Sequence, residues 1–154
     1  MAGVTRWRAA TAVGTAALML ALLSACVSPF TPGESSNGMT SSEKTDSLAE
    51  AITATSANIT TTYVETGRDG LTKNLWVNPV LDGDSLSASE LDAVLKAAYG
   101  AYADEVSSIE IRAEDAAGEP VALGDAASTL GIHFLPNTNS VTYMTSDLDA
   151  AYGK

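Results

Sequence analysis

Apolar and polar positions follow three different patterns along the chain. Residues 9–23 are almost continuously apolar, residues 27–47 are rich in Ser, Thr, Gly, Pro and charge without an apolar period, and later segments are periodic. A period of two is typical of half-buried strands, and a period of 3.6 is typical of amphipathic helices. The pattern predicts an apolar leader over residues 1–25, a flexible tether over residues 26–56, and one folded domain over residues 57–154.

One stretch of the tether has an apolar spacing of its own. Leu48 and Ile52 lie four positions apart, which is the spacing of neighbours on one helix face. A short helix and a frayed turn both fit this pair, and the sequence leaves the two open.

The domain is expected to begin with a β-hairpin. Residues 58–65 are rich in β-branched and aromatic residues, with Ile59 and Tyr63 on one face, and residues 71–80 alternate again after a turn that contains two glycines. Pro79 has no N–H to donate, so it is expected at a strand end or on a sheet edge.

A helix follows the hairpin. Ser87 and Glu90 have the spacing of a capping box, in which each side chain accepts a hydrogen bond from the other residue's backbone N–H. The apolar stripe that should pack on the sheet consists of Leu91, Val94, Leu95, Ala98 and Tyr102. Residues 107–114 then alternate as a third strand, with Ile109 and Ile111 facing inward.

The C-terminal part has weaker signals. Residues 121–130 fit a short helix that ends at Gly131, residues 141–144 fit a last strand, and residues 147–154 fit a short helix or a loose tail. The predicted fold class is α+β. The expected architecture is a small sandwich with an antiparallel sheet in the order β-β-α-β-α, plus a fourth strand at most, and helices on one face.

The leader has the layout of an export signal. Arg6 and Arg8 precede the apolar residues 9–23, which are fewer than the roughly 20 residues that a membrane-spanning helix needs. The apolar run ends in Leu23, Ser24, Ala25 and Cys26, and Cys26 is the single cysteine of the chain.

This tetrad resembles the lipobox of bacterial lipoproteins. The resemblance covers residues 1–26, and it implies cleavage before Cys26 and attachment of a diacylglyceryl group to its sulfur. It also implies that the protein is held at the extracytoplasmic face of the cell membrane by this lipid. No known family is recognised in the domain beyond it.

Charge and cysteine content narrow the possible partners. The formal net charge is −11, and removing Arg6 and Arg8 with the leader gives 6 − 19 = −13. A domain this acidic is repelled by nucleic acid, so we expect no nucleic-acid partner. A single cysteine cannot form a disulfide within the chain, so the domain must be stabilised by its own core.

Candidate chemistry is sparse. His133 is the single histidine, and without a second histidine or another cysteine it suggests no transition-metal site. No metal, no cofactor and no catalytic residue are predicted, and a small envelope hydrolase using His133 with a nearby carboxylate is the alternative. The discriminating feature is whether His133 faces a cleft that holds both an acid and a hydroxyl.

The best sign of a binding surface is aromatic. Trp76 shares the polar face of the second strand with Asn74 and Asn78, so it is either a contact residue or an ordinary packed side chain covered by Tyr143 or the terminal segment. The sequence therefore predicts a non-enzymatic, lipid-anchored protein whose small domain binds a ligand or serves as the accessory subunit of an envelope complex.

Overall fold

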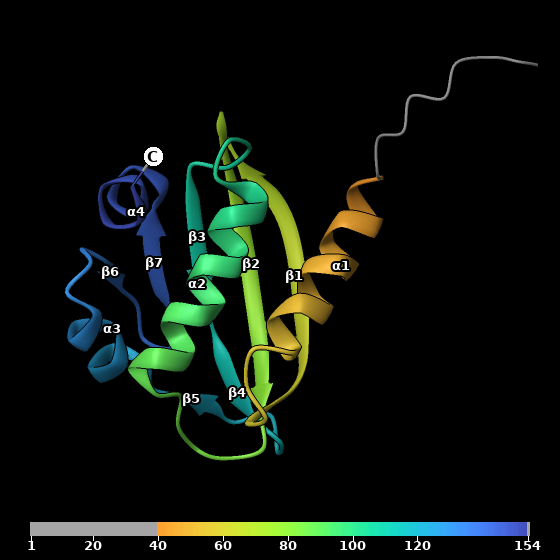
Figure 1. Cartoon of the computed structure of the whole chain (residues 1–154), viewed down its shortest axis with the longest axis vertical. Coiled ribbons are helices and arrows are strands. Elements are labelled where there is room, and N and C mark those ends of the chain that lie inside the picture. Colours follow the sequence, from red (N-terminus) through yellow and green to blue (C-terminus); the bar gives the residue numbers. More distant parts are fainter. Residues whose placement is uncertain (1–39, 154) are drawn as a thin grey trace, which may run out of the picture. The chain divides into compact units, whose positions relative to one another are not determined.

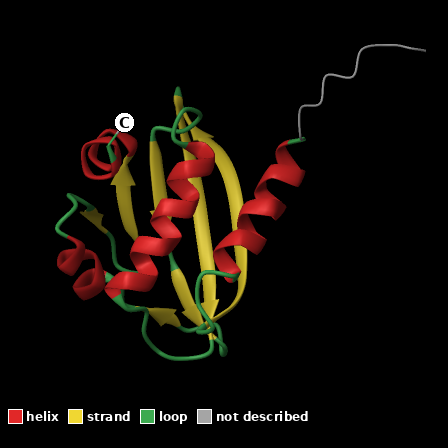
Figure 2. Ribbon diagram, in the orientation of Figure 1, coloured by secondary structure: helices red, strands yellow, loops and turns green. Residues whose placement is uncertain are grey.

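Seven strands form one sheet in the computed structural model, which describes residues 40–153. The strands are β1 (Ile59–Asp69), β2 (Thr72–Leu81), β3 (Ser108–Ile111), β4 (Ala113–Asp115), β5 (Pro120–Val121), β6 (Leu135–Pro136) and β7 (Val141–Met144). The helices of this part are α1 (Ser41–Thr53), α2 (Ala88–Tyr102), α3 (Gly124–Leu130) and α4 (Thr145–Tyr152). Figures 1 and 2 show α1 and α2 on one side of the sheet. The predicted α+β class is confirmed.

The sheet is mixed, so the prediction of an antiparallel sheet was wrong. β2 pairs antiparallel with β1 on one side and parallel with both β3 and β4 on the other, while β7 pairs antiparallel with β3 and β6. The hairpin makes β1 and β2 antiparallel. The chain then returns through α2 to the end of the sheet where β2 began, and a helical crossover of this kind makes the next strand parallel.

The core lies between the helices and one face of the sheet. α2 has the predicted capping box at Ser87 and Glu90, and all five residues of its predicted apolar stripe are buried. Ile109 and Ile111 face the same core, as expected. Each of the four helices in residues 40–153 contributes a buried side chain to this one cluster. The opposite face of the sheet carries polar and partly exposed side chains, and it is called the open sheet face below.

The folded domain extends further toward the N-terminus than expected. Residues 26–56 were predicted to be a flexible tether, but α1 starts after the N-cap Thr40, whose side chain forms a capping box with Glu43. Leu48 is 5% exposed and Ile52 is fully buried against the sheet. The tether prediction was therefore wrong for residues 41–53, because these two apolar residues gain their stability from tertiary burial that a local pattern does not reveal.

A β-bulge changes which side chains of β1 face the core. The pairing with β2 shifts between Ile59 and Thr61, so Ile59 and Thr62 are buried while Tyr63 is 62% exposed. The expectation that Ile59 and Tyr63 share a face was wrong, because a bulge adds one residue and reverses the alternation beyond it.

Pro79 lies in a central strand and not on an edge. Its position in β2 falls between the residues that pair with β3 and those that pair with β4. The neighbouring chain is interrupted at Arg112, where a proline without an N–H cannot continue the ladder.

The C-terminal predictions are confirmed in part: α3 begins at Gly124 and not at residue 121, and the short strands β4, β5 and β6 bring the sheet to seven strands where at most four were expected. Gly131 ends α3 with a φ of 68°, and the last strand and terminal helix are β7 and α4. None of the helices in residues 40–153 has the length and apolar character needed to cross a bilayer. The leader, the cleavage residues Leu23 to Ala25 and the lipidation residue Cys26 lie outside the described residues.

Candidate functional site

The open sheet face carries a shallow cavity of about 440 Å³. Its walls are side chains that alternate with the buried residues of three neighbouring strands, so the strand pairing alone brings them together. The lining residues are Tyr63, Glu65, Trp76, Asn78, Glu110 and Arg112. Two aromatic rings, two carboxylates, an amide and a guanidinium therefore share one exposed surface.

Trp76 is held in a fixed position at this cavity. Its indole lies over Gly67 of β1 so closely that a Cβ atom on that glycine would be 2.1 Å from Trp76 Cζ3. Indole Nε1 also donates a hydrogen bond of 3.2 Å to Oε2 of Glu110 on β3. The ring is thus fixed from both neighbouring strands, and 38% of the residue stays exposed.

The Glu110 carboxylate connects Trp76 to the segment before β7. Its Oε1 accepts a hydrogen bond of 2.7 Å from Oγ of Ser140, which is only 6% exposed. Both carboxylate oxygens therefore accept hydrogen bonds, Oε2 from Trp76 on β2 and Oε1 from Ser140. This network orients the indole.

The remaining polar groups near the cavity differ in whether they have a hydrogen-bond or ion-pair partner. Arg112 Nε lies 3.6 Å from Oε1 of Glu114, and about half of the Arg112 side chain is exposed. Oδ1 of Asn78 is buried and has no hydrogen-bond partner among residues 40–153. Asn74 does not line the cavity. Its Oδ1 accepts a hydrogen bond of 2.9 Å from Oγ of Ser108. The structure therefore brings Trp76 and Asn78 together and leaves Asn74 beside them.

Neither of the expected covers lies over Trp76. Tyr143 is fully buried on the helix side of the sheet, where its ring centre lies 6.0 Å from that of Phe134. The terminal helix α4 packs into the same core through Leu148. The interpretation that Trp76 is packed beneath Tyr143 or the terminal segment is therefore wrong for the described residues. Trp76 remains exposed, as the interpretation of a contact residue requires.

Sequence reasoning missed four residues of the cavity. Glu110 and Arg112 alternate with Ile109 and Ile111, which were predicted to face inward, but their position beside Trp76 depends on the parallel register of β2 and β3. Tyr63 was assigned to the wrong face because the bulge precedes it, and Glu65 lies two residues further on. The alternation of residues 107–114 was the available signal for Glu110 and Arg112. It did not reveal which strand lies beside these residues.

His133 forms a pair with one carboxylate. Its Nδ1 lies 3.1 Å from Oδ2 of Asp147, and its side chain is 71% exposed. The adjoining cavity of about 310 Å³ is otherwise lined by Gly131, Ile132, Ala150 and Ala151, so no hydroxyl or thiol borders it. The acid of the hydrolase alternative is present at this site, whereas its hydroxyl is not. Within residues 40–153, no group of three or more His, Cys, Asp or Glu side chains is placed to bind a metal ion.

No protein-family model, curated protein or solved structure matches this chain. The residues and their geometry are therefore the only basis for inferring a function.

Proposed function

We propose that this chain is a lipoprotein, anchored through a lipid on Cys26 at the extracytoplasmic face of the cell membrane, whose domain binds an envelope protein through the open sheet face. The leader and the tetrad that ends at Cys26 support the anchor. The exposed side chains at the cavity of the open sheet face support the binding role.

The observation that carries the binding role is the exposed but immobilised Trp76. Trp, Tyr and Arg dominate the energetics of protein interfaces, and Trp76, Tyr63 and Arg112 are all present at the cavity. A side chain that is already fixed in the free protein loses less conformational entropy on binding. The contacts from Gly67 and Glu110 therefore favour Trp76 as an interface anchor.

The polar groups around the indole point to a protein partner. Oδ1 of Asn78 lacks a hydrogen-bond donor, and Arg112 retains exposed donor groups. Protein interfaces combine a buried aromatic centre with a polar rim that forms about one hydrogen bond per 100–200 Å². A carboxylate or carbonyl of the partner would accept hydrogen bonds from the exposed donor groups of Arg112.

The anchor keeps this surface near the membrane. Residues 27–39 separate Cys26 from Thr40, the first described residue, and a chain of this length spans at most about 50 Å when fully extended. The start of the domain at Thr40 is therefore expected within this distance of the bilayer, and the partner surface within this distance plus the width of the domain.

Co-purification of the full chain from detergent-solubilised envelopes tests the binding role. We expect one stoichiometric protein to be retained by the parent chain and lost from Trp76→Ala. Leu71→Ala is the matched control, because Leu71 is fully exposed at the hairpin turn away from the cavity. Equal retention of that protein by both variants, or no retained protein at all, would contradict the proposal.

Substitution of Cys26 tests the anchor. Cys26→Ala is expected to accumulate as a precursor with its leader and without added lipid mass, because no sulfur remains to be acylated. Ser35→Ala, beyond the tetrad, is expected to be processed normally. Mature protein of unchanged mass in the membrane fraction of Cys26→Ala would refute the anchor.

A second candidate function is favoured by the hydrogen bond between His133 and Asp147. A carboxylate that orients an imidazole is the arrangement of a general base, which here would activate water directly. If the domain hydrolyses a p-nitrophenyl ester, His133→Ala and Asp147→Asn should both abolish the activity, and Asp125→Asn should not. Hydrolysis that survives in His133→Ala would exclude this role.

A further inference from the structure

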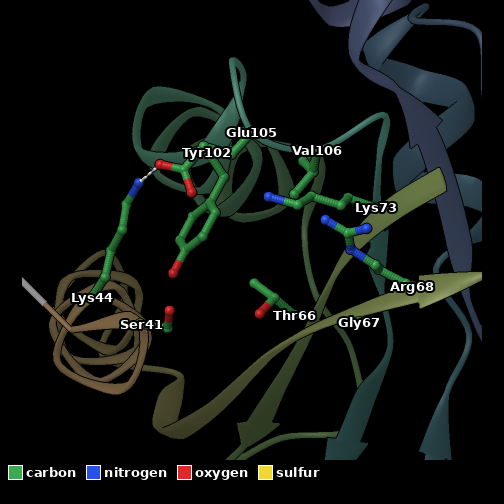
Figure 3. Close-up of a pocket in the computed structure, with 9 residues that line it drawn as sticks. All are labelled: Ser41, Lys44, Thr66, Gly67, Arg68, Lys73, Tyr102, Glu105 and Val106. Atoms are coloured by element: carbon green, nitrogen blue, oxygen red, sulfur yellow. Dashed lines mark hydrogen bonds and ion pairs between the residues drawn. The ribbon is translucent and has the colours of Figure 1, made fainter. Parts of the chain in front are cut away.

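A second cavity, of about 340 Å³, lies on the helix side of the sheet. It is formed where the β1–β2 hairpin meets the start of α1 and the end of α2 (Figure 3). The lining residues are Ser41, Lys44, Thr66, Gly67, Arg68, Lys73, Tyr102, Glu105 and Val106. This cavity and the open sheet face lie on opposite sides of the sheet. Arg68 and Lys73 are in phase with the buried residues of their strands and face the helices, whereas Tyr63 and Trp76 are out of phase and face the open side.

Positive charge is concentrated at this cavity in an otherwise acidic domain. Residues 40–153 contain five Lys and Arg residues and 18 Asp and Glu residues, a formal balance of 5 − 18 = −13. Three of the five basic side chains, those of Lys44, Arg68 and Lys73, line the cavity. Such a concentration is expected of a site that attracts an anion against the field of the whole domain.

Two of these three cations lack a carboxylate partner. Lys44 forms an ion pair with Glu105, and its Nζ lies 4.2 Å from the centre of the Tyr102 ring. No Asp or Glu of residues 40–153 forms an ion pair with Arg68 or Lys73. Figure 3 shows both of these side chains extending from the hairpin toward the space beside Tyr102. The cavity therefore holds two uncompensated positive charges.

A buried hydroxyl points into the same space. Tyr102 is only 3% exposed, yet its Oη has no hydrogen-bond partner among residues 40–153. Leaving a buried hydroxyl unpaired costs about 1–3 kcal/mol, so such groups usually have a partner. The hydroxyl extends between α1 and β1 in Figure 3, where it can donate a hydrogen bond to a ligand in the cavity.

We propose that this cavity binds a small molecule or headgroup through a phosphate-type oxyanion. The two free charges of Arg68 and Lys73 suit a phosphate group, either a dianionic monoester or the monoanionic diester of a phospholipid, and the guanidinium can donate two parallel hydrogen bonds to its oxygens. The hydroxyls of Tyr102, Ser41 and Thr66 supply further donors. The volume exceeds that of phosphate alone and falls within the range of small-molecule pockets.

The site stands apart from the proposed partner surface and requires neither the partner nor the lipid anchor. It lies beside Ser41 at the start of α1, which follows Cys26 by 41 − 26 = 15 residues in the sequence. The phosphate group can therefore come from a soluble molecule or from a membrane phospholipid, and the two sources are distinguished by experiment.

Titration of the isotope-labelled full chain in phosphate-free maltoside micelles tests the proposal. Inorganic phosphate, added at constant ionic strength, is expected to shift the backbone amide signals of Gly67, Lys73 and Val106 in a saturable manner if the source is soluble. Micelles doped with phosphatidylglycerol are expected to produce these shifts without added phosphate if the source is a lipid headgroup. The absence of saturable shifts in both arms would overturn the proposal.

Substitutions distinguish phosphate binding at a defined site from general electrostatic attraction of phosphate to basic side chains. Arg68→Gln and Lys73→Gln are each expected to weaken the response about tenfold or more, because each removes one charge-assisted contact. Lys96→Gln is the matched control, since Lys96 pairs with Asp92 on α2 outside the cavity. Tyr102→Phe should weaken binding about threefold or more without lowering the free energy of unfolding. Equal responses in Arg68→Gln, Lys73→Gln and Lys96→Gln would refute the site.

Discussion

The indole of Trp76 lies across Gly67 on the neighbouring strand, where any side chain larger than hydrogen would overlap it. A Cβ atom at position 67 would lie 2.1 Å from Cζ3 and 2.3 Å from Cη2 of the indole. Glycine weakens a strand, and an aromatic ring placed over it restores packing. The pair therefore fixes the ring of the candidate interface while leaving its outer side to solvent.

Gly67→Ala is expected to displace the Trp76 indole. The new methyl group cannot occupy the space of the ring, so the ring must rotate away and the Nε1 hydrogen bond to Glu110 is lost. We expect a loss of stability of about 1 kcal/mol and loss of the retained partner protein. Fluorescence of Trp76 in a Trp7→Phe background should show the changed surroundings. An unchanged emission spectrum would contradict the contact.

Ile52→Ala is expected to destabilise the whole domain. Ile52 is fully buried although it lies in the segment predicted to be a tether. Removing its side chain should lower the free energy of unfolding by about 2–5 kcal/mol, measured by urea denaturation. Ser47→Ala, at an exposed position of α1, should change it by about 0.5 kcal/mol or less. Similar stabilities for the two variants would indicate that α1 is not part of the core.

Glu90 is expected to make stability depend on pH in the acid range. Hydrogen bonds from the Ser56 hydroxyl and from the hydroxyl and amide of Ser87 lower the pKa of Glu90 from 4.5 to about 2. The unfolded chain therefore takes up this proton first, and the free energy of unfolding falls as pH decreases from about 4.5 to 2. Glu90→Gln should lose about 1–2 kcal/mol at neutral pH and show a flatter profile in this range.

Urea denaturation between pH 2 and pH 7 checks the role of Glu90. Asp84→Asn is the control, because Asp84 is exposed in the loop before α2. A profile for Glu90→Gln that runs parallel to that of the parent chain would show that Glu90 does not contribute to the acid dependence.

Tyr143→Phe is expected to leave the domain as stable as before or more stable. The Tyr143 hydroxyl is buried without a partner among the described residues, and burial raises its pKa to about 12. Burial disfavours the tyrosinate, so the parent chain should lose stability as pH rises from about 10 toward 12, and the variant should lose less. Thermal denaturation at pH 7 and pH 11 measures both effects. Tyr63→Phe, at an exposed position, should match the parent chain at both pH values.

Local sequence signals predicted the elements that carry strong local patterns. The capping box of Ser87 and Glu90, the buried stripe of α2 and the end of α3 at Gly131 all depend on residues within a few positions of one another. Such patterns require no knowledge of the rest of the fold.

Features that depend on distant pairing were not predictable in this way. The buried state of Ile52 requires the sheet, and the inward turn of Thr62 requires the bulge opposite Val80. The contact between Trp76 and Glu110 requires the parallel register of two strands that are about 30 residues apart. Of the candidate site, the sequence could identify Trp76 and Asn78 but not their neighbours.

The placement of β7 governs when the protein can complete its fold. This strand lies between β3 and β6, and it brings Tyr143 into the core although it is the last strand of residues 40–153. A nascent chain that has not yet been synthesised beyond Asn139 therefore leaves β3 with an unpaired edge. A stop codon before Val141 would expose that edge to other chains and favour aggregation.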